Sequence, residues 1–356
     1  MVGVEQGLLS ICCLGYKHAR YLSDNICSIR AIGYERLEVV AIDDGSADGS
    51  IELLRELAKG VPFRMEVIAQ ENTGNIGLNF NNAYRRSRGE LVTFIALDDV
   101  YNPAVMRRQI DMMNDDPDLA FVTPSKSVGI DDNGFIKDKS PTLKLDSMDV
   151  RSVQELLELE YSEFGSFYIQ GVIFRRDVID AIGGFDEDMT GDDIVLRTKI
   201  FRYLQERSPA RGFRIIRDNA CFYRLHDGNV HKNPARQIRI VTEYLERFWS
   251  DRDNPRVLLD WVCSYIESYR FDEYIGFFAV NRRAASLLRE ERIQTQIRRS
   301  VREEFDSLRR LRRFIYERKK LGDGKRRVII LNCIRFDYSR ARPATPAVHY
   351  SEYGKQ

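Results

Sequence analysis

A chain of 356 residues, 43% hydrophobic and 31% charged, is long enough for one large globular domain and a smaller second region. Its 55 Lys and Arg residues against 54 Asp and Glu residues leave a net charge of +1, which gives no reason to expect nucleic-acid binding. No apolar run approaches the roughly 20 residues that cross a bilayer. The first residues lack the basic segment and apolar core of a signal peptide, so we expect a cytoplasmic protein whose six cysteines are reduced.

The first 125 residues alternate between short apolar segments and segments with helical spacing. This alternation predicts an α/β fold with a mostly parallel sheet between helices, in which ligands bind beyond the carboxyl ends of the strands. Two predicted strands end in paired acids, Asp43 with Asp44 and Asp98 with Asp99, so both pairs should face one crevice. The predicted strands are 8–14, 37–42, 63–69, 91–97 and 119–123, and the predicted helices are 20–32, 50–59, 78–87 and 103–114.

The second half of the chain has a different pattern of apolar and polar residues. Residues 124–160 are polar and irregular up to a short helix, and after Pro234 the pattern is nearly all helical and strongly basic towards the end. We therefore expect an α/β domain over 1–235 and a mainly helical, basic C-terminal region over 236–356. Between them the pattern predicts strands at 167–174, 213–217 and 220–226 and helices at 151–158, 176–182 and 194–206.

Five motifs occur in order over residues 8–230. They lie in "LLSICCLGYKHARYLSDNICSIRAIGYERLEVVAIDDGSADGS", "ENTGNIGLNFNNAYRRSRGELVTFIALDDVYNP", "IFRRDVIDAIGGFDEDMTGDDIVLR" and "FYRLHDGN". Their order and spacing resemble the inverting nucleotide-sugar glycosyltransferases of the GT-A fold, family two. The resemblance implies transfer of a sugar, hexosyl or N-acetylhexosaminyl, from a nucleoside diphosphate sugar, most commonly a UDP-sugar. It also implies an acceptor hydroxyl on a glycan or a lipid-linked molecule, in polysaccharide or surface-glycan synthesis.

Paired carboxylates at the end of a buried strand repel each other unless a cation lies against them. A nucleoside diphosphate leaving group also needs a divalent cation, and hard oxygen ligands suit Mg²⁺ or Mn²⁺. The resemblance implies that Asp98 binds the metal, that Asp99 supports it, and that His226 in "FYRLHDGN" completes the coordination. For His18, His231 and His349 we expect structural roles only.

The resemblance also implies a set of residues that contact the donor. Asp43 or Asp44 would accept hydrogen bonds from the base or ribose, although a capped turn with solvated acids explains the same motif. Gln170 and Gly171 would contact the donor sugar or the acceptor, although a tight turn fits equally. The predicted donor-binding residues are Asp43, Asp44, Gly45, Asn81, Asp98, Asp99, Gln170 and Gly171.

Displacement with inversion needs a base for the proton of the attacking hydroxyl. By resemblance, Asp193 takes the place of that base and Asp192 the place of the acid before it. Adjacent acids raise each other's pKa whereas a helix N-terminus lowers it, and the sequence does not decide between the two effects. We expect the preceding acids, Asp186, Glu187 and Asp188, to be solvated.

One position departs from the family pattern: Ala96 stands where the family usually has an acid two residues before the metal ligand. The alternative function is therefore a non-catalytic relative that binds nucleotide sugar or carbohydrate. A pyrophosphorylase would need a Gly-rich basic loop after the first strand, and a dinucleotide-binding dehydrogenase would need Gly-x-Gly-x-x-Gly there. The segment "LGYKHARYL" supplies neither.

Charge is segregated towards the C-terminus. From Arg282 to Arg327 there are 17 Lys and Arg against 7 Asp and Glu, a net charge of +10, which leaves the rest of the chain at −9. A helix with an apolar stripe flanked by arginines can bind an anionic membrane surface, here through 286–327, at the inner face of the cytoplasmic membrane. The alternative is a stripe packed on the catalytic domain or in a homo-oligomer. The stripe is Ile293, Ile297, Val301, Phe305, Leu308, Leu311 and Ile315, and the arginines include Arg298, Arg302, Arg309, Arg312 and Arg313.

Overall fold

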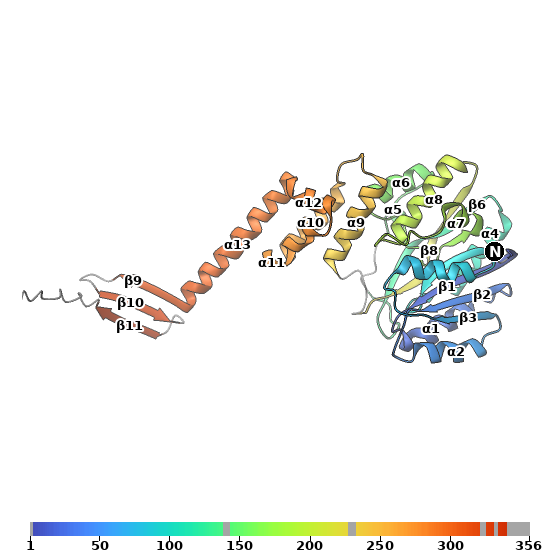
Figure 1. The fold of residues 1–356 in the computed structure, drawn as a ribbon, viewed down its shortest axis with the longest axis horizontal. Helices are drawn as coiled ribbons and strands as arrows, with labels where there is room; N and C mark the ends of the chain where they lie inside the picture. The colour runs from blue at the N-terminus through green and yellow to red at the C-terminus, as the bar shows by residue number, and fades with distance from the viewer. Residues whose placement is uncertain (1–2, 138–142, 227–232, 321–324, 331–333, 340–356) are drawn as a thin grey trace, which may run out of the picture.

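The computed structural model describes residues 3–137, 143–226, 233–320, 325–330 and 334–339, with side chains up to residue 306. The body of the molecule is an α/β domain built on a curved sheet with helices on both faces, as Figure 1 shows. The strands of this sheet are β1 (Glu5–Gly15), β2 (Leu37–Asp43), β3 (Arg64–Ala69), β4 (Gly89–Ala96), β5 (Val100–Tyr101), β6 (Leu119–Ile130), β7 (Ile173–Arg175) and β8 (Gly212–Arg224). The predicted α/β fold class is therefore confirmed.

The strand order is β3-β2-β1-β4-β7-β6-β8-β5, with β7 antiparallel to both of its neighbours and β5 antiparallel to β8. The parallel strands β2, β1 and β4 end level with one another, because Gly15 pairs with Asp43 and Leu14 pairs with Ala96. The loops that follow these three strands therefore leave the sheet at one edge. This edge carries both predicted acid pairs.

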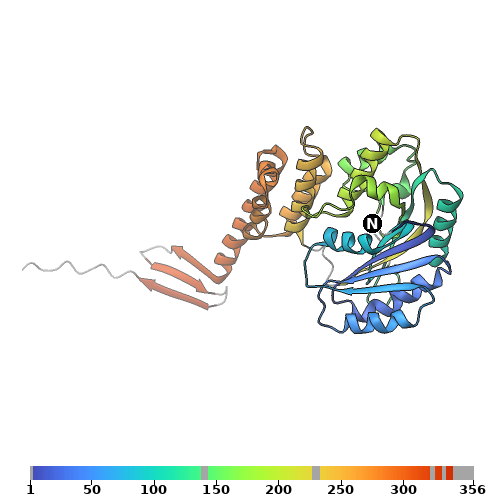
Figure 2. The same ribbon diagram turned by 45° about the vertical axis from the view of Figure 1, so that its right-hand side comes forward.

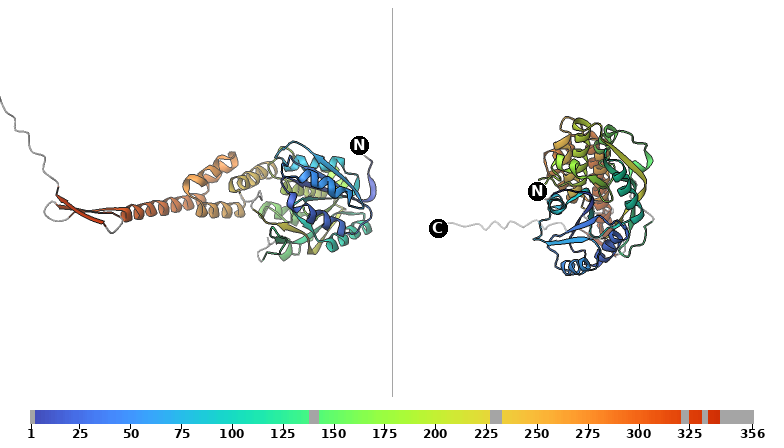
Figure 3. Two further views of the ribbon diagram at one scale, coloured as in Figure 1. Left: turned by 90° about the horizontal axis from the view of Figure 1, so that it is seen from below. Right: turned by 90° about the vertical axis from the view of Figure 1, so that its right-hand side faces the viewer.

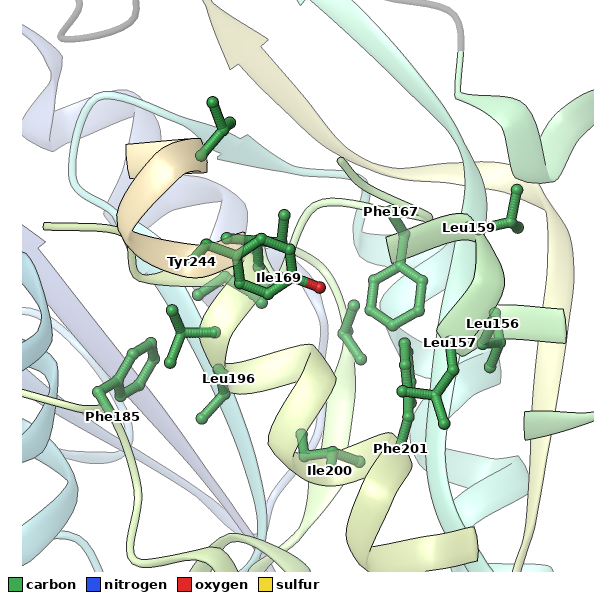
Figure 4. Packing of buried hydrophobic residues seen from close by; sticks show 14 of the residues in the cluster. Leu156, Leu157, Leu159, Phe167, Ile169, Phe185, Leu196, Ile200, Phe201 and Tyr244 are labelled. Carbon is green, nitrogen blue, oxygen red and sulfur yellow. The ribbon is translucent and has the colours of Figure 1, made fainter. Parts of the chain in front are cut away.

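Two apolar clusters bury the two faces of the sheet. One lies between β1, β2, β4 and helices α1, α2 and α4, and the other lies between the sheet and helices α3, α6, α7 and α8. Figure 4 shows the second cluster, where Leu157, Phe201 and Phe167 pack beside Leu196 and Tyr244. The helices of the body are η1 (Ala19–Tyr21), α1 (Leu22–Ala31), α2 (Ser50–Lys59), α3 (Ile76–Arg86), α4 (Pro103–Asp115), α5 (Lys144–Ser147), α6 (Val153–Ser162), α7 (Arg176–Ile182) and α8 (Asp193–Arg207).

Two strand predictions differ from the structure. The predicted strand 167–174 shortens to β7, because the backbone of Ser166 and Ile169 bonds to side chains and Gly171 adopts a φ of 83°. The predicted strands 213–217 and 220–226 form one strand, β8, which pairs with β6 through several register shifts.

The C-terminal region begins with helices that pack on the body, and its buried residues belong to the same cluster as α8 up to Ile293. Helix α13 then leads away from the body and carries a three-stranded antiparallel sheet, as Figures 1 and 2 show. The sequence pattern did not predict this small sheet. The elements are α9 (Pro234–Phe248), α10 (Arg256–Ser268), α11 (Phe271–Tyr274), η3 (Ile275–Ala279), α12 (Arg282–Ser286), η4 (Leu287–Arg289), α13 (Glu291–Ile315), β9 (Tyr316–Lys320), β10 (Lys325–Ile330) and β11 (Ile334–Ser339).

Candidate active site

Asp98 lies in the turn after β4, between two histidines from distant parts of the chain. Its Oδ2 is 2.9 Å from Nε2 of His226, and its Oδ1 is 3.6 Å from Nδ1 of His18. One ligand atom from each residue lies within 4.8 Å of the others. Burial alone would raise the pKa of Asp98, but the hydrogen bond with His226 and the nearby His18 lower it overall. The turn thus holds a buried, ionised carboxylate between two imidazoles.

This cluster fits a divalent cation. Among the described residues, Asp98 Oδ1 and His18 Nδ1 are buried side-chain atoms without a hydrogen-bond partner. Buried polar atoms are usually hydrogen-bonded. Two unpaired atoms that can both ligate a metal and lie close together therefore indicate a binding site. Two imidazole nitrogens beside one carboxylate suit Mn²⁺ or a related transition metal better than Mg²⁺, which prefers oxygen ligands.

His18 was expected to have only a structural role, but the structure places its ring beside Asp98, where it is a third candidate ligand. It follows β1, the central strand next to β4, through a tight loop in which Lys17 has a φ of 59°. The amide of Lys17 donates to Ser46 Oγ at 2.7 Å, and the amide of Ala19 donates to Asp48 at 3.1 Å. The signal available in the sequence was its place directly after a central strand, at the edge where ligands bind.

Unlike Asp98, which contacts the two histidines, Asp99 is hydrogen-bonded to the end of β8. It is fully buried, its Oδ1 accepts from the amide of Arg224 at 2.9 Å, and burial together with the Asp98 charge raises its pKa. The buried Arg224 side chain donates from Nε to the Asp98 carbonyl at 2.8 Å and from Nη1 to the carbonyls of Asp131 and Asp132. Arg224, at the end of β8, therefore connects the turn that carries Asp98 to the hairpin at 131–136 through hydrogen bonds.

The two acids after β2 have different surroundings. The Asp44 carboxylate accepts from Gln70, from the amide and hydroxyl of Thr73 and from the amide of Gly74, so it holds the 70–74 loop. Asp43 accepts from the amide of Ser46 at 2.9 Å through Oδ1, whereas its Oδ2 is buried without a partner among the described residues. Of this pair, only Asp43 keeps an oxygen for a ligand.

Gly45 and Asn81 hold loops in place. Gly45 has a φ of 78°, and a Cβ there would lie 2.7 Å from the amide nitrogen of Asn72. The amide group of Asn81 bonds to the nitrogen and the oxygen of Phe185, each at 2.9 Å, and to Glu187. Donor contact by these residues stays a prediction, and for Asn81 these bonds already use both polar atoms of the side chain.

The acids of the loop before α8 were expected to be solvated: Glu187 and Asp188 are exposed, whereas Asp186 is half-buried, and each of the three has a basic partner. Asp186 pairs with Lys199, Glu187 with Arg85 and Asp188 with Arg247. These contacts fasten the loop to α3, α8 and α9, so the N-terminus of α8 has a fixed position.

Asp193 is the first residue of α8, and its side chain is 21% exposed. Its Oδ2 accepts from the amide of Ile169 at 3.3 Å and lies 3.7 Å from Arg197 Nη1, while Asp192 caps the helix through the amide of Asp193 at 2.8 Å. Burial and the charge of Asp192 raise the pKa of Asp193 to about 7 against the opposing effect of Arg197. Burial and the like charge of Asp192 therefore outweigh the opposing effects of Arg197 and of the Ile169 amide on this pKa.

Two tyrosines lie between the acid groups. The Tyr168 ring stacks on Tyr223 with centroids 6.0 Å apart, and burial and the charges of Asp99, Asp98 and Asp193 raise the pKa of Tyr223. The same cavity is lined by Gln170, whose Oε1 is buried without a partner among the described residues. Gly171 has a φ of 83°, and a Cβ there would meet Ala220 at 3.0 Å.

Comparison with known proteins agrees with this geometry. Residues 10–183 match the model of the family described as "Glycosyl transferase family 2". The chain is 28% identical over 233 residues to an uncharacterized glycosyltransferase of Nostoc sp. (strain PCC 7120), covering 64% of this chain and 67% of that one. It is 25% identical over 272 residues to a poly-beta-1,6-N-acetyl-D-glucosamine synthase of Staphylococcus aureus, covering 74% of this chain but only 58% of the synthase.

A solved structure shares the fold. Residues 1–349 of S. aureus TarS, in complex with UDP-GlcNAc, superpose with a TM-score of 0.57 at 16% identity, covering 94% of this chain and 100% of that one. No helix among the described residues is long and apolar enough to cross a membrane.

Proposed function

Because this chain is a family 2 glycosyltransferase of the GT-A fold, we propose that it transfers a sugar from a UDP-sugar, with inversion, to a hydroxyl of a glycan or lipid-linked acceptor. The observation that carries the proposal is the buried Asp98 carboxylate held between His18 and His226 at the carboxyl edge of the sheet. Asp193 lies within electrostatic range of the same turn, since its charge acts on Asp99. A cation site and a candidate base therefore share one edge.

Each residue has a role in this proposal. Asp98, His18 and His226 would hold a divalent cation, with Mn²⁺ preferred, and the bound cation would stabilise the charge of the departing diphosphate. Asp193 takes the proton of the acceptor hydroxyl, for which a carboxyl with a pKa near 7 is well suited. The buried Oδ2 of Asp43 accepts a hydrogen bond from the nucleoside.

The first donor to test is UDP-N-acetylglucosamine. The S. aureus relatives are named as synthases of a poly-N-acetylglucosamine, and the TarS structure was solved with UDP-GlcNAc. This chain spans 58% of those synthases, so polymer synthesis, whether of a polysaccharide or of another surface glycan, belongs to the proposal.

The alternative, a relative that binds nucleotide sugar without turnover, rests on Ala96. The raised pKa of Asp193 supports catalysis, because a base that works near neutral pH needs a carboxyl group that can hold a proton there.

We place the enzyme at the inner face of the cytoplasmic membrane, attached through the basic segment 286–327. Ile293 is buried against the body, whereas Val301 and Phe305 further along α13 are exposed. The contact would thus begin near Val301, and a homo-oligomer contact through the same helix is the competing explanation.

The test is release of UDP from a panel of UDP-sugars, with UDP-N-acetylglucosamine first, in the presence and absence of Mn²⁺. We expect D98N to abolish metal-dependent release without loss of fold, and D193N to retain donor binding while turnover falls at least about 100-fold. D111N is the matched control, since Asp111 is exposed and pairs with the surface residue Arg107. Full activity in D98N contradicts the metal site, and surviving turnover in D193N places the base elsewhere.

A further inference from the structure

We propose that the buried pair of Glu160 and Arg197 positions Asp193 and controls its readiness to accept a proton. This inference rests on the proposed role of Asp193 as the base. Glu160 and Arg197 are positioning residues here, since the structure connects them to the chemistry only through Asp193 and the 165–170 segment.

The pair is closed off from solvent. Glu160 on α6 is 0% exposed and Arg197 on α8 is 3% exposed. Arg197 Nε donates to Glu160 Oε1 at 2.8 Å and Nη2 donates to Oε2 at 3.0 Å, which is a bidentate geometry. The elements that carry the pair, α6 and α8, pack with the 167–169 segment through apolar side chains of one cluster, which Figure 4 shows.

The pair and the base hold the two ends of one short segment. Glu160 Oε1 accepts from the amide of Ser166 at 3.1 Å and also from its hydroxyl, and Asp193 Oδ2 accepts from the amide of Ile169 at 3.3 Å. The segment carries Tyr168 and Gln170, which line a small cavity together with Tyr223. The position of the cavity wall therefore depends on the same contacts as the position of the base.

Arg197 stands one turn after Asp193 on the same helix, so its charge acts directly on the base. Arg197 lowers the pKa of Asp193, whereas Glu160 and Asp192 raise it beyond the effect of burial. By pairing with Arg197, Glu160 prevents a bare guanidinium from making Asp193 too weak a base.

Other charged or titratable groups of the described residues also act on Asp193 or on Arg197. Asp192 and Arg197 lie on its own helix, Glu160 on α6 and Tyr168 on the 165–170 segment. Tyr223 on β8 and Asp99 after β4 face it from the sheet, and Tyr244 on α9 lies near Arg197. Of these, only Glu160 and Arg197 form a buried bidentate ion pair.

The experiment measures the protonation of Asp193 directly. In protein labelled with ¹³C at the aspartate carboxyls, the resonance absent from D193N is that of Asp193, and its titration is followed by NMR from pH 4 to 9. The pH profile of Mn²⁺-dependent UDP release from UDP-N-acetylglucosamine gives a second readout.

In E160Q the amide keeps an acceptor for Ser166 but no longer neutralises Arg197. We expect the titration midpoint of Asp193 to fall by about 0.5–1 pH unit. The acid limb of the activity profile should move to lower pH with it, because a base works only when deprotonated. The matched control is E158Q, since Glu158 lies on the same helix in a bidentate pair with Arg252 that faces away from Asp193.

A second variant tests the inference even if E160Q does not fold. The double variant E160Q/R197M leaves no buried charge unpaired and should fold where the single variant fails. Arg197 lowers the pKa of Asp193 more than Glu160 raises it. Removing both charges should therefore raise the titration midpoint of Asp193 instead of lowering it.

The inference is overturned if folded E160Q titrates like wild type, if E158Q shifts it equally, or if the midpoint falls in the double variant. These outcomes leave the proposed function intact as long as D193N is inactive. An active D193N contradicts the proposed base itself, and this inference with it.

Discussion

Asp98 and Asp99 are adjacent in the chain, yet their surroundings give them opposite acid strengths. Two histidines lower the pKa of Asp98, whereas burial beside that charge raises the pKa of Asp99. Asp99 in turn accepts a hydrogen bond from Arg224, which fixes the backbone that presents Asp98. One acid of the pair thus faces the candidate metal site, and its neighbour holds the turn.

The position of His18 leads to a prediction for metal affinity. Replacing His18 with Ala removes one of three donors, so the Mn²⁺ concentration for half-maximal UDP release should rise at least about 10-fold. The matched control is His349→Ala, at a residue that lies outside the described part of the chain and is expected to have no metal role. An unchanged Mn²⁺ requirement in His18→Ala would contradict a metal-binding role for His18 and leave it with a structural role.

Asp193 should also link stability to pH. Its pKa of about 7 in the fold lies above its ordinary value of 3.8, so ionisation favours the unfolded chain as pH rises between these values. D193N removes this effect, and its melting temperature relative to wild type should therefore increase from pH 5 to pH 8. The measurement is thermal unfolding at both pH values.

The control for this measurement is D188N, because Arg247 lowers the pKa of Asp188 in the fold. D188N should show no such gain at pH 8. A D193N difference that is the same at pH 5 and pH 8 would mean that the carboxyl is not destabilised by its surroundings.

At the scale of elements, α13 changes character along its length. Its first turn carries Ile293, which is 0% exposed in the cluster shared with α10, while Phe305 is 66% exposed. The stripe expected from the sequence is therefore packed at its beginning and exposed further on. The packing expected as one alternative is therefore observed at the start of the described helix, and a membrane contact through its exposed part stays a prediction.

This difference predicts unequal costs for two substitutions on the same stripe. Ile293→Ala should reduce the free energy of unfolding by about 2–5 kcal/mol, because it leaves a cavity. Phe305→Ala should change it by no more than about 0.5 kcal/mol. Urea unfolding of both variants tests this, and equal costs would contradict the packing of α13.

At the scale of the whole molecule, the acidic body and the basic extension are separated in space. Figures 2 and 3 show α13 and the small sheet leading away from the α/β body. The net charge is +10 over 282–327, which includes α13 and β9, and −9 over the rest of the chain. Such an arrangement favours binding to an anionic surface through the extension.

The full chain should therefore co-sediment with phosphatidylglycerol vesicles at low salt and less so at high salt. A chain ending at residue 300, which keeps Ile293 and Ile297 on the body, should lose this binding and retain UDP release. Neutral vesicles are the control. If the full chain does not bind and light scattering gives a multiple of 41.4 kDa, the extension is an oligomer contact instead.

The sequence by itself determined the features that depend on local patterns. Alternating apolar and helical segments predicted β1 to β4 and helices α1 to α4 within a few residues, because these elements follow from side-chain periodicity. It also predicted that acids end strands β2 and β4 at one edge, since parallel strands place their carboxyl ends together. The order of motifs indicated the family.

Only the tertiary structure decided which of these residues meet. His18, Asp98 and His226 come together because β1 lies beside β4 and the end of β8 lies against the turn, an order that no local pattern contains. The hydrogen bonds of Asp44 and the raised pKa of Asp193 depend likewise on burial and on partners distant in sequence. The strands β9 to β11 went unpredicted because basic residues interrupt their alternation, and pairing between strands decides such segments.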